Sequence, residues 1–226
     1  MQIAIDGPAA SGKSTAARLL TGRLGFLYID TGAMYRAVTY KAIEKNINFD
    51  NKDSLIEIAR NINMKIKQDP QSKTGYKVMV QDNAKWTDVT EDLFKPEVDR
   101  LVSIVASIRD IRIILVKEQR EMARKENVVM AGRDIGSNVL PDADLKIFLV
   151  ASPQKRAIRR QKELENNGEK KELCEILENI RQRDRIDSTR KDNPLVKTAD
   201  AVEVDSSDLS IDEMVDLLEK YARERM

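Results

Sequence analysis

The sequence has no histidine, one cysteine and few aromatic residues, and each shortage excludes a kind of chemistry. Without imidazole, the chain cannot build a Ser-His-Asp triad or a His-ligated zinc site, and it lacks the commonest general base. The single cysteine, Cys174, cannot form an internal disulfide or a site of several thiolates. Aromatic residues make up only 4% of the chain, which argues against stacking on nucleic-acid bases.

Net charge and long apolar runs are also missing. The 39 basic residues balance 38 acidic ones, so no overall field draws the chain toward nucleic acid or a membrane. No run approaches the ~20 apolar residues that span a bilayer, and the N-terminus lacks the pattern of a secretion signal. We therefore expect a cytoplasmic protein with no membrane or nucleic-acid partner, in which any basic site is local.

Short apolar stretches alternate with helical patterns along the 226 residues. This alternation predicts an α/β fold of three layers, with helices on both faces of a five-stranded parallel sheet. The expected strands are 2–6, 26–29, 128–131, 145–150 and 201–204. The expected helical segments are 13–24, 33–45 and those near 96–126, 153–186 and 210–225.

Residues 64–86 break this rhythm. Two alternating stretches, 64–67 and 76–80, are joined by a turn-rich connector at 69–75, which predicts a small antiparallel insertion. A turn at Asn166-Asn167-Gly168 is expected to join two helices.

Directly after the first strand, the sequence Gly7-Pro-Ala-Ala-Ser-Gly-Lys-Ser14 has the spacing of a phosphate-binding loop, with a helix following. In such a loop, backbone N–H groups and the helix N-terminus face the phosphates. Lys13 is expected to reach the β- and γ-phosphates, and the Ser14 hydroxyl to ligate magnesium. The alternative is a turn that only connects two elements. We predict a site for ATP with Mg2+ formed by Gly7, Pro8, Ala9, Ala10, Ser11, Gly12, Lys13, Ser14 and Thr15.

Two classes of phosphate-loop protein are disfavoured. A GTPase is expected to carry Asn-Lys-x-Asp after a strand, whereas Asn51-Lys-Asp-Ser54 ends in serine and precedes a helical pattern. A motor ATPase usually has an apolar strand ending in paired acids, whereas the strand at 145–150 is followed by Ala-Ser-Pro. A kinase and a nucleotide-sensing module remain.

Two polar loops follow other predicted strands, Asp30-Thr-Gly-Ala-Met-Tyr-Arg36 and Gly132-Arg-Asp-Ile-Gly136. Ligands of open α/β folds bind at the carboxyl ends of the strands, so these loops are expected to hold a second ligand. The alternatives are a helix cap at the start of the first loop and an ion pair between Arg133 and Asp134 in the second.

Basic side chains outnumber acidic ones between 155 and 191. Such helical charge runs are usually solvated faces. However, Arg156, Arg159 and Arg160 directly follow a strand, where a closing lid would bring them over the triphosphate. We expect a lid at about 153–175 that excludes water from the site.

Three blocks, Ile5 to Ser14, Asp30 to Arg36 and Ala131 to Gly136, together resemble the bacterial cytidylate kinases. The blocks Arg181 to Asp187 with Arg190, Pro194-Leu195 and Ala199-Asp-Ala201 add to this resemblance, which extends from residue 3 to about 205. It implies one kinase domain over 1–226 with a monophosphate-binding insertion at about 33–110. It also implies that a monomer transfers the γ-phosphoryl group of ATP to CMP or dCMP.

The resemblance also implies roles for individual residues. Arg36, Arg133 and Arg190 would bind the CMP phosphate, Arg183, Asp187 and Tyr35 would lie near the sugar, and Ser103, Arg112 and Asp134 would read the base. The full CMP-binding set is Thr31, Tyr35, Arg36, Ser103, Arg112, Arg133, Asp134, Arg183, Asp187 and Arg190. The candidate catalytic residues are Lys13, Arg133, Arg183 and Arg190.

The cytosine edge gives these assignments a chemical check. Asp134 can accept from the cytosine amine while Arg112 donates to N3 and O2, so CMP is expected to be preferred over UMP. Without the resemblance, Ser103 and Arg112 read as ordinary helix surface. Relatives often have glycine at the Ser14 position followed by threonine, so the magnesium hydroxyl belongs to Ser14 or Thr15, and loop spacing favours Ser14. The competing functions are a uridylate, adenylate or shikimate kinase and a regulatory nucleotide-binding module.

Overall fold

The computed structural model describes residues 1–69, 71–166 and 168–226. Five strands form a parallel sheet of order β2-β6-β1-β7-β8, which confirms the predicted α/β class. The strands are β1 (Gln2–Asp6), β2 (Leu27–Asp30), β6 (Val128–Gly132), β7 (Leu145–Val150) and β8 (Val202–Asp205). Each lies within one residue of its predicted position.

Apart from α3 (Lys52–Asn61), which lies outside the predicted segments, the helices follow those segments, and two of the segments are divided. They are α1 (Lys13–Leu24), α2 (Thr31–Glu44), α3 (Lys52–Asn61), α4 (Pro96–Ser107), α5 (Arg109–Ala123), α6 (Pro153–Asn166), α7 (Leu173–Thr189) and α8 (Ile211–Arg223), with short turns η1 (Asp92–Phe94) and η2 (Ile135–Val139). The extended backbone of Ile108 divides the segment near 96–126 into α4 and α5. The predicted turn at 166–168 lies partly outside the described residues, because Asn167 is not described, and the same holds for the connector at 69–75, which contains Pro70.

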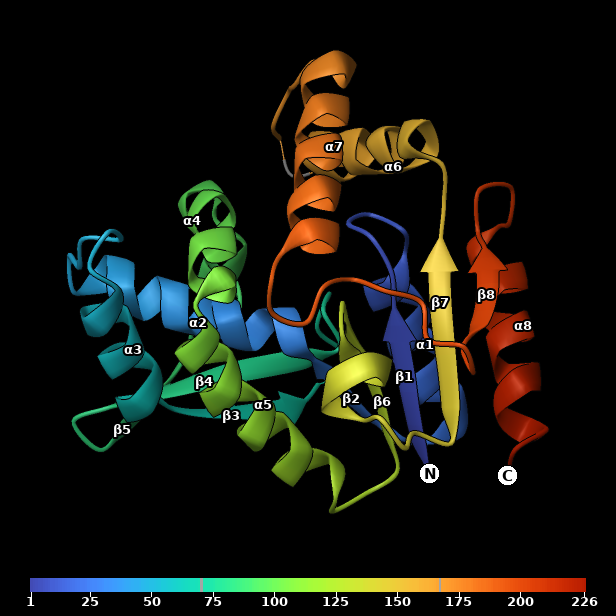
Figure 1. Cartoon of the computed structure of the whole chain (residues 1–226), viewed down its shortest axis with the longest axis horizontal. Helices are drawn as coiled ribbons and strands as arrows, with labels where there is room; N and C mark the ends of the chain where they lie inside the picture. Colours follow the sequence, from blue (N-terminus) through green and yellow to red (C-terminus); the bar gives the residue numbers. More distant parts are fainter. Residues whose placement is uncertain (70, 167) are drawn as a thin grey trace. The chain divides into compact units, whose positions relative to one another are not determined.

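The chain packs as two compact units, described here in turn. The first comprises residues 1–26 and 128–226. Its strands β1, β7 and β8 point the same way, and α6 begins just beyond the arrowhead of β7 (Figure 1). Local signals set its helix ends: Gly25 takes the left-handed conformation that ends α1, and Ser210 and Glu213 form a capping box at the start of α8.

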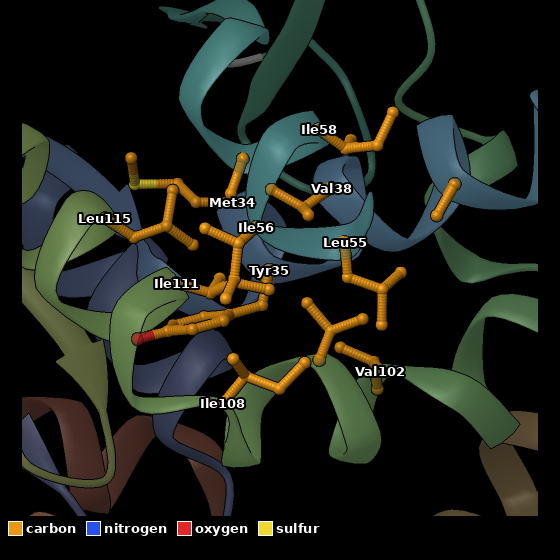
Figure 2. Packing of buried hydrophobic residues seen from close by; sticks show 13 residues of the cluster. Met34, Tyr35, Val38, Leu55, Ile56, Ile58, Val102, Ile108, Ile111 and Leu115 are labelled. Atoms are coloured by element: carbon orange, nitrogen blue, oxygen red, sulfur yellow. The ribbon is translucent and has the colours of Figure 1, made fainter. Parts of the chain in front are cut away.

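The second unit, residues 27–127, contains an antiparallel sheet of order β3-β4-β5. Its strands are β3 (Asn63–Gln68), β4 (Tyr76–Asp82) and β5 (Lys85–Asp88). The predicted antiparallel insertion is thus confirmed, with β5 as an additional third strand. Helices α2 to α5 share an apolar cluster that includes Met34, Leu55 and Leu115 (Figure 2). This cluster fixes the position of α2 within the unit.

Within the described ranges, no helix has both the length and the apolar character that crossing a membrane would require.

Candidate active site

The loop between β1 and α1 has the backbone that a phosphate cradle needs. Gly7 and Gly12 have φ angles of 151° and 95°, and Ala10 also takes a left-handed conformation with φ 57°. A Cβ at Gly7 would lie 2.0 Å from the carbonyl oxygen of Leu149, so only glycine fits there. These turns are typical of loops that direct successive backbone N–H groups toward an anion.

Lys13 is the first residue of α1, and its side chain returns over the loop. Its Nζ donates to the Pro8 carbonyl at 2.6 Å and lies 3.3 Å from the Ser11 hydroxyl. The side chain is buried, so its charge is only weakly screened by solvent. Ser14 is exposed and Thr15 half-buried in the same first turn. The loop thus places the Lys13 ammonium group beside the Ser11 hydroxyl, and Ser14 and Thr15 follow Lys13 in the first turn of α1.

Asp6, the last residue of β1, joins the phosphate loop to the loop after β6. Its Oδ1 accepts the Ile135 N–H at 2.8 Å, and its Oδ2 accepts the Gly136 N–H at 2.7 Å. Burial raises the pKa of the Asp6 carboxyl to about 6, and the nearby charge of Asp134 adds to the rise, whereas the two N–H bonds and the Lys13 charge oppose it. Asp6 therefore orients the segment that carries Arg133 and Asp134.

Arg156 is a buried side chain that joins α6, α7 and the phosphate loop. It donates to the carbonyl oxygens of Ala151 at 2.9 Å and Ala9 at 3.0 Å. Its two terminal nitrogens also donate to both carboxylate oxygens of Asp184, at 3.0 and 2.5 Å. A bidentate pair of this kind fixes orientation as well as distance. In this structure the predicted triphosphate ligand Arg156 supports the backbone of the loop.

The next two predicted lid arginines have different surroundings. Arg159 donates to the Ser206 hydroxyl at 3.0 Å and to the Ser206 carbonyl, and one nitrogen lies 3.4 Å from the Ser11 carbonyl. Ser206 is fully buried at the end of β8. Arg160 pairs with Glu163 one turn along α6, at 2.8 Å. Arg159 thus lies at the phosphate loop, and Arg160 lies on the outer part of α6.

Within the first unit, the predicted CMP residues form two ion pairs. Arg133 donates through Nε to Asp187 at 2.7 Å, and Arg190 donates to Asp134 at 3.1 Å. Arg133 therefore pairs with α7 and not with its neighbour Asp134, which was the alternative drawn from the sequence. Arg183 lies half-buried on α7, one residue before Asp184. The loop after β6 and the end of α7 thus form one charged cluster.

Within the second unit, Tyr35 and Arg112 lie together. The Arg112 guanidinium carbon is 5.8 Å from the centroid of the Tyr35 ring, and Arg112 also contacts the Ala106 carbonyl at 3.4 Å. Figure 2 shows Tyr35 among the apolar side chains of the cluster. Arg112 is buried, which differs from the helix-surface alternative, while Ser103 is half-buried on α4. The Tyr35 ring and the Arg112 guanidinium are therefore both buried within the second unit.

The start of α2 carries Thr31 and Arg36. Thr31 is buried in the first turn. Arg36 donates to the Asp99 carboxylate at 2.6 Å and to the Leu93 carbonyl at 3.1 Å. Three elements of the second unit, α2, η1 and α4, thus meet at one guanidinium.

Asp30 precedes α2, but its side chain makes no cap hydrogen bond. Its Oδ2 instead accepts the hydroxyls of Tyr76 at 3.1 Å and Tyr28 at 3.4 Å. Burial and the Asp30 charge raise the pKa of Tyr76, so its hydroxyl stays protonated and donates. The helix-cap alternative for Asp30 is thus replaced by a link to β4.

Comparison with known proteins identifies the family. The model of the family described as cytidylate kinase matches residues 3–224. A cytidylate kinase of Bacillus thuringiensis (strain Al Hakam) is 46% identical over 215 residues, covering 95% of this chain and 92% of that protein. A cytidylate kinase of Bacillus anthracis (strain CDC 684 / NRRL 3495) matches to the same extent. The chain belongs to the cytidylate kinase family.

A crystal structure of an uncharacterized protein from Eubacterium ventriosum is similar in fold to this cytidylate kinase family member. It is 16% identical, with a TM-score of 0.52, and the match covers 100% of this chain and 99% of that chain. Likeness at this identity concerns the fold alone.

Sequence reasoning missed several residues that support the site in this member of the cytidylate kinase family. Asp99, Asp184 and Ser206 each contact a predicted ligand residue or the phosphate loop, and Asp6 accepts the N–H of Ile135, next to predicted Asp134. Only Asp6 had a local signal, because a carboxylate at the end of a buried strand and directly before a phosphate loop is unusual. The other three act across long sequence separations.

Proposed function

We propose that this chain transfers the γ-phosphoryl group of ATP to CMP or dCMP, giving CDP or dCDP and ADP. The observation that carries this proposal is the loop at residues 7–14, whose left-handed turns and buried Lys13 form a phosphate cradle. Family membership supplies the acceptor, since the curated relatives are called cytidylate kinases.

The reaction needs no protein base. The second pKa of a phosphate monoester is about 6, so the acceptor oxygen of CMP is already anionic near neutral pH. That oxygen forms a bond to the γ-phosphorus while the bond to the β,γ-bridging oxygen breaks, and ADP leaves with the bonding electrons. The absence of histidine is consistent with such a reaction. Asp6 is not required as a base either, because both its oxygens accept backbone N–H groups.

What the protein would supply is positive charge, held in orientation within each unit. Lys13 is assigned to the β- and γ-phosphates, and Arg36, Arg133 and Arg190 to the acceptor phosphate. Each of these arginines is paired with a carboxylate in this structure. Pre-arranged cations lower the repulsion between two polyanions without reorganising during the reaction. The carboxylates keep the guanidinium groups oriented before the nucleotides bind.

Magnesium fits the donor set at the start of α1. Ser14 presents an exposed hydroxyl there, a hard oxygen ligand of the kind that Mg2+ accepts. No cluster of three or more metal-ligating side chains occurs among the residues that the structure describes, so the remaining ligands would be nucleotide phosphates and water. When bound, Mg2+ would neutralise charge on the transferring group. The hydroxyl of Thr15 is the second choice.

Base selection is assigned to Ser103, Arg112 and Asp134. The Asp134 carboxylate would accept from the cytosine amine, and Arg112 would donate to the ring acceptors. Arg156, Arg159 and Arg160 are assigned to the lid over the triphosphate at about 153–175. We further propose that the enzyme is a cytoplasmic monomer, as the resemblance to the bacterial cytidylate kinases implies.

The direct test is ADP release with Mg-ATP against CMP, dCMP, UMP and AMP. We expect CMP and dCMP to be phosphorylated and CMP to exceed UMP in kcat/KM by at least about tenfold. Asp134→Ala should narrow the CMP to UMP ratio, whereas Asp142→Ala, an exposed carboxylate of the same unit, should not. Binding of ATP without turnover on any monophosphate would instead favour the regulatory module.

A further inference from the structure

The guanidinium of Arg36 is held on three sides within the second unit. Asp99 on α4 accepts from Nη2 at 2.6 Å, Leu93 in η1 accepts through its carbonyl from Nη1 at 3.1 Å, and the Phe94 ring centroid lies 5.3 Å from Cζ. We propose that Asp99 is a positioning residue for the acceptor phosphate: it holds Arg36 in the orientation in which that arginine receives the phosphate of CMP. This inference rests on the proposed function.

The geometry allows Asp99 and a phosphate to share one guanidinium. Arginine carries five N–H donors in one plane. The bonds to Asp99 and Leu93 use one N–H on each terminal nitrogen, so the same plane still has donors for a phosphate. A carboxylate bound to one edge therefore orients the rest of the fork.

The pair is sheltered enough to keep this orientation. The side chain of Arg36 is 16% exposed and that of Asp99 26% exposed, so solvent and salt screen their attraction only in part. The face of Phe94 also restricts the guanidinium, since a cation is attracted to the face of an aromatic ring. An arginine held in this way loses less side-chain entropy when the phosphate arrives.

The backbone that carries Asp99 is itself well fixed. Pro96 occupies the first turn of α4, where its restricted φ favours a helix start. Val98, next to Asp99, is fully buried. Asp99 lies in the first turn of α4, where the positive end of the helix dipole attracts a carboxylate. The position of Asp99 therefore follows from the packing of α4.

The opposite role would be competition, in which Asp99 occupies the place of the phosphate and must be displaced. The two roles predict opposite signs for removal of the carboxylate. Loss of a positioning residue weakens CMP binding, whereas loss of a competitor strengthens it. Cytidine has no phosphate, so its binding affinity should not change on removal of the Asp99 carboxylate under either role.

The experiment compares CMP with cytidine by calorimetry, together with kcat and KM for CMP. We expect Asp99→Ala to weaken CMP binding about tenfold and to change cytidine binding less than about twofold. Asp99→Asn keeps an acceptor oxygen for Nη2 and should remain within about threefold of wild type. Glu97→Ala removes an exposed acid from the same helical turn and should leave CMP binding unchanged.

A double-mutant cycle shows whether Asp99 acts through Arg36. In an Arg36→Ala background, Asp99→Ala should cause no further loss of CMP affinity. Tighter CMP binding in Asp99→Ala, an equal loss for CMP and cytidine, or no change at all would each overturn the inference. Failure of the proposed function would be seen separately, in a wild-type protein that phosphorylates no CMP.

Discussion

The phosphate loop and helix α2 both carry candidate ligand residues, yet different forces hold them in place. The loop is supported by buried charged and polar groups, among them Arg156 and Ser206. Helix α2 is fixed by apolar side chains, including Met34 and Val38 (Figure 2). Charged hydrogen bonds specify orientation, and removing one partner costs free energy because the other group is left buried and unpaired. Apolar packing tolerates changes that conserve volume.

The largest effect on stability is expected in the apolar cluster. Leu55→Ala should lower the free energy of unfolding by about 3 kcal/mol, because Leu55 is fully buried in the cluster. Leu55→Met, which nearly conserves volume, should cost less than about 1.5 kcal/mol. Urea denaturation measures both.

The same variant tests whether the phosphate loop is independent of the apolar cluster. If polar contacts alone set the phosphate loop, folded Leu55→Ala should bind Mg-ATP as well as wild type does in calorimetry. A large loss of ATP affinity in the folded variant would show that the apolar cluster also controls the loop.

An intermediate effect is expected at Asp184. Asp184→Asn removes the charge that faces buried Arg156 and should destabilise the fold by about 2 kcal/mol, below the usual range for buried pairs because the Asp184 side chain is 27% exposed. Mg-ATP binding should also weaken, since Arg156 donates to the Ala9 carbonyl in the loop. Denaturation and calorimetry on the same sample give both quantities.

The control pair lies within α6, the helix that also carries Arg156. Glu163 pairs with Arg160 but its side chain is 59% exposed, so Glu163→Gln should cost less than about 0.5 kcal/mol. An equal loss of unfolding free energy in Asp184→Asn and Glu163→Gln would contradict the explanation that burial strengthens the Arg156–Asp184 pair.

The last prediction concerns the titration of Asp6. Its pKa rises from an ordinary 3.8 to about 6 chiefly because of burial, so the folded protein binds this proton more tightly than the unfolded chain does. The resulting stabilisation is complete below about pH 4 and is lost as the pH rises through about 6. Carboxyl-carbon NMR should show this titration, and Asp134→Asn should lower the Asp6 pKa by removing a nearby negative charge. A titration near pH 4 in the wild type would refute the role of burial.

Much of the fold could be predicted from local pattern. Strands such as β1 and β7 are short apolar runs, and α1 has both an apolar periodicity and a glycine at its end. The division between α4 and α5 was not predicted, because the apolar spacing continues through Ile108 while the backbone there becomes extended. Strand β5 was also missed, since four residues give too little alternation to detect.

The candidate site also has one part that local sequence predicts and another that it does not. The spacing from Gly7 to Ser14 is a local feature, because a phosphate cradle needs consecutive backbone N–H groups and a helix start. The partners of its charged groups are not local. Arg156 meets Asp184 28 residues away, and Arg36 meets Asp99 across 63 residues. A sequence contains many acids that could serve equally well as partners.

By itself, the sequence determined the order of the parallel strands and of most helices, the phosphate loop and the absence of imidazole chemistry, because these depend on neighbouring residues or on composition. Only the tertiary structure decided which carboxylate faces each arginine and which of those charges are buried. The physical reason is that the strength of a charge pair depends on distance and on exclusion of water. Both quantities arise only when segments far apart in the chain pack together.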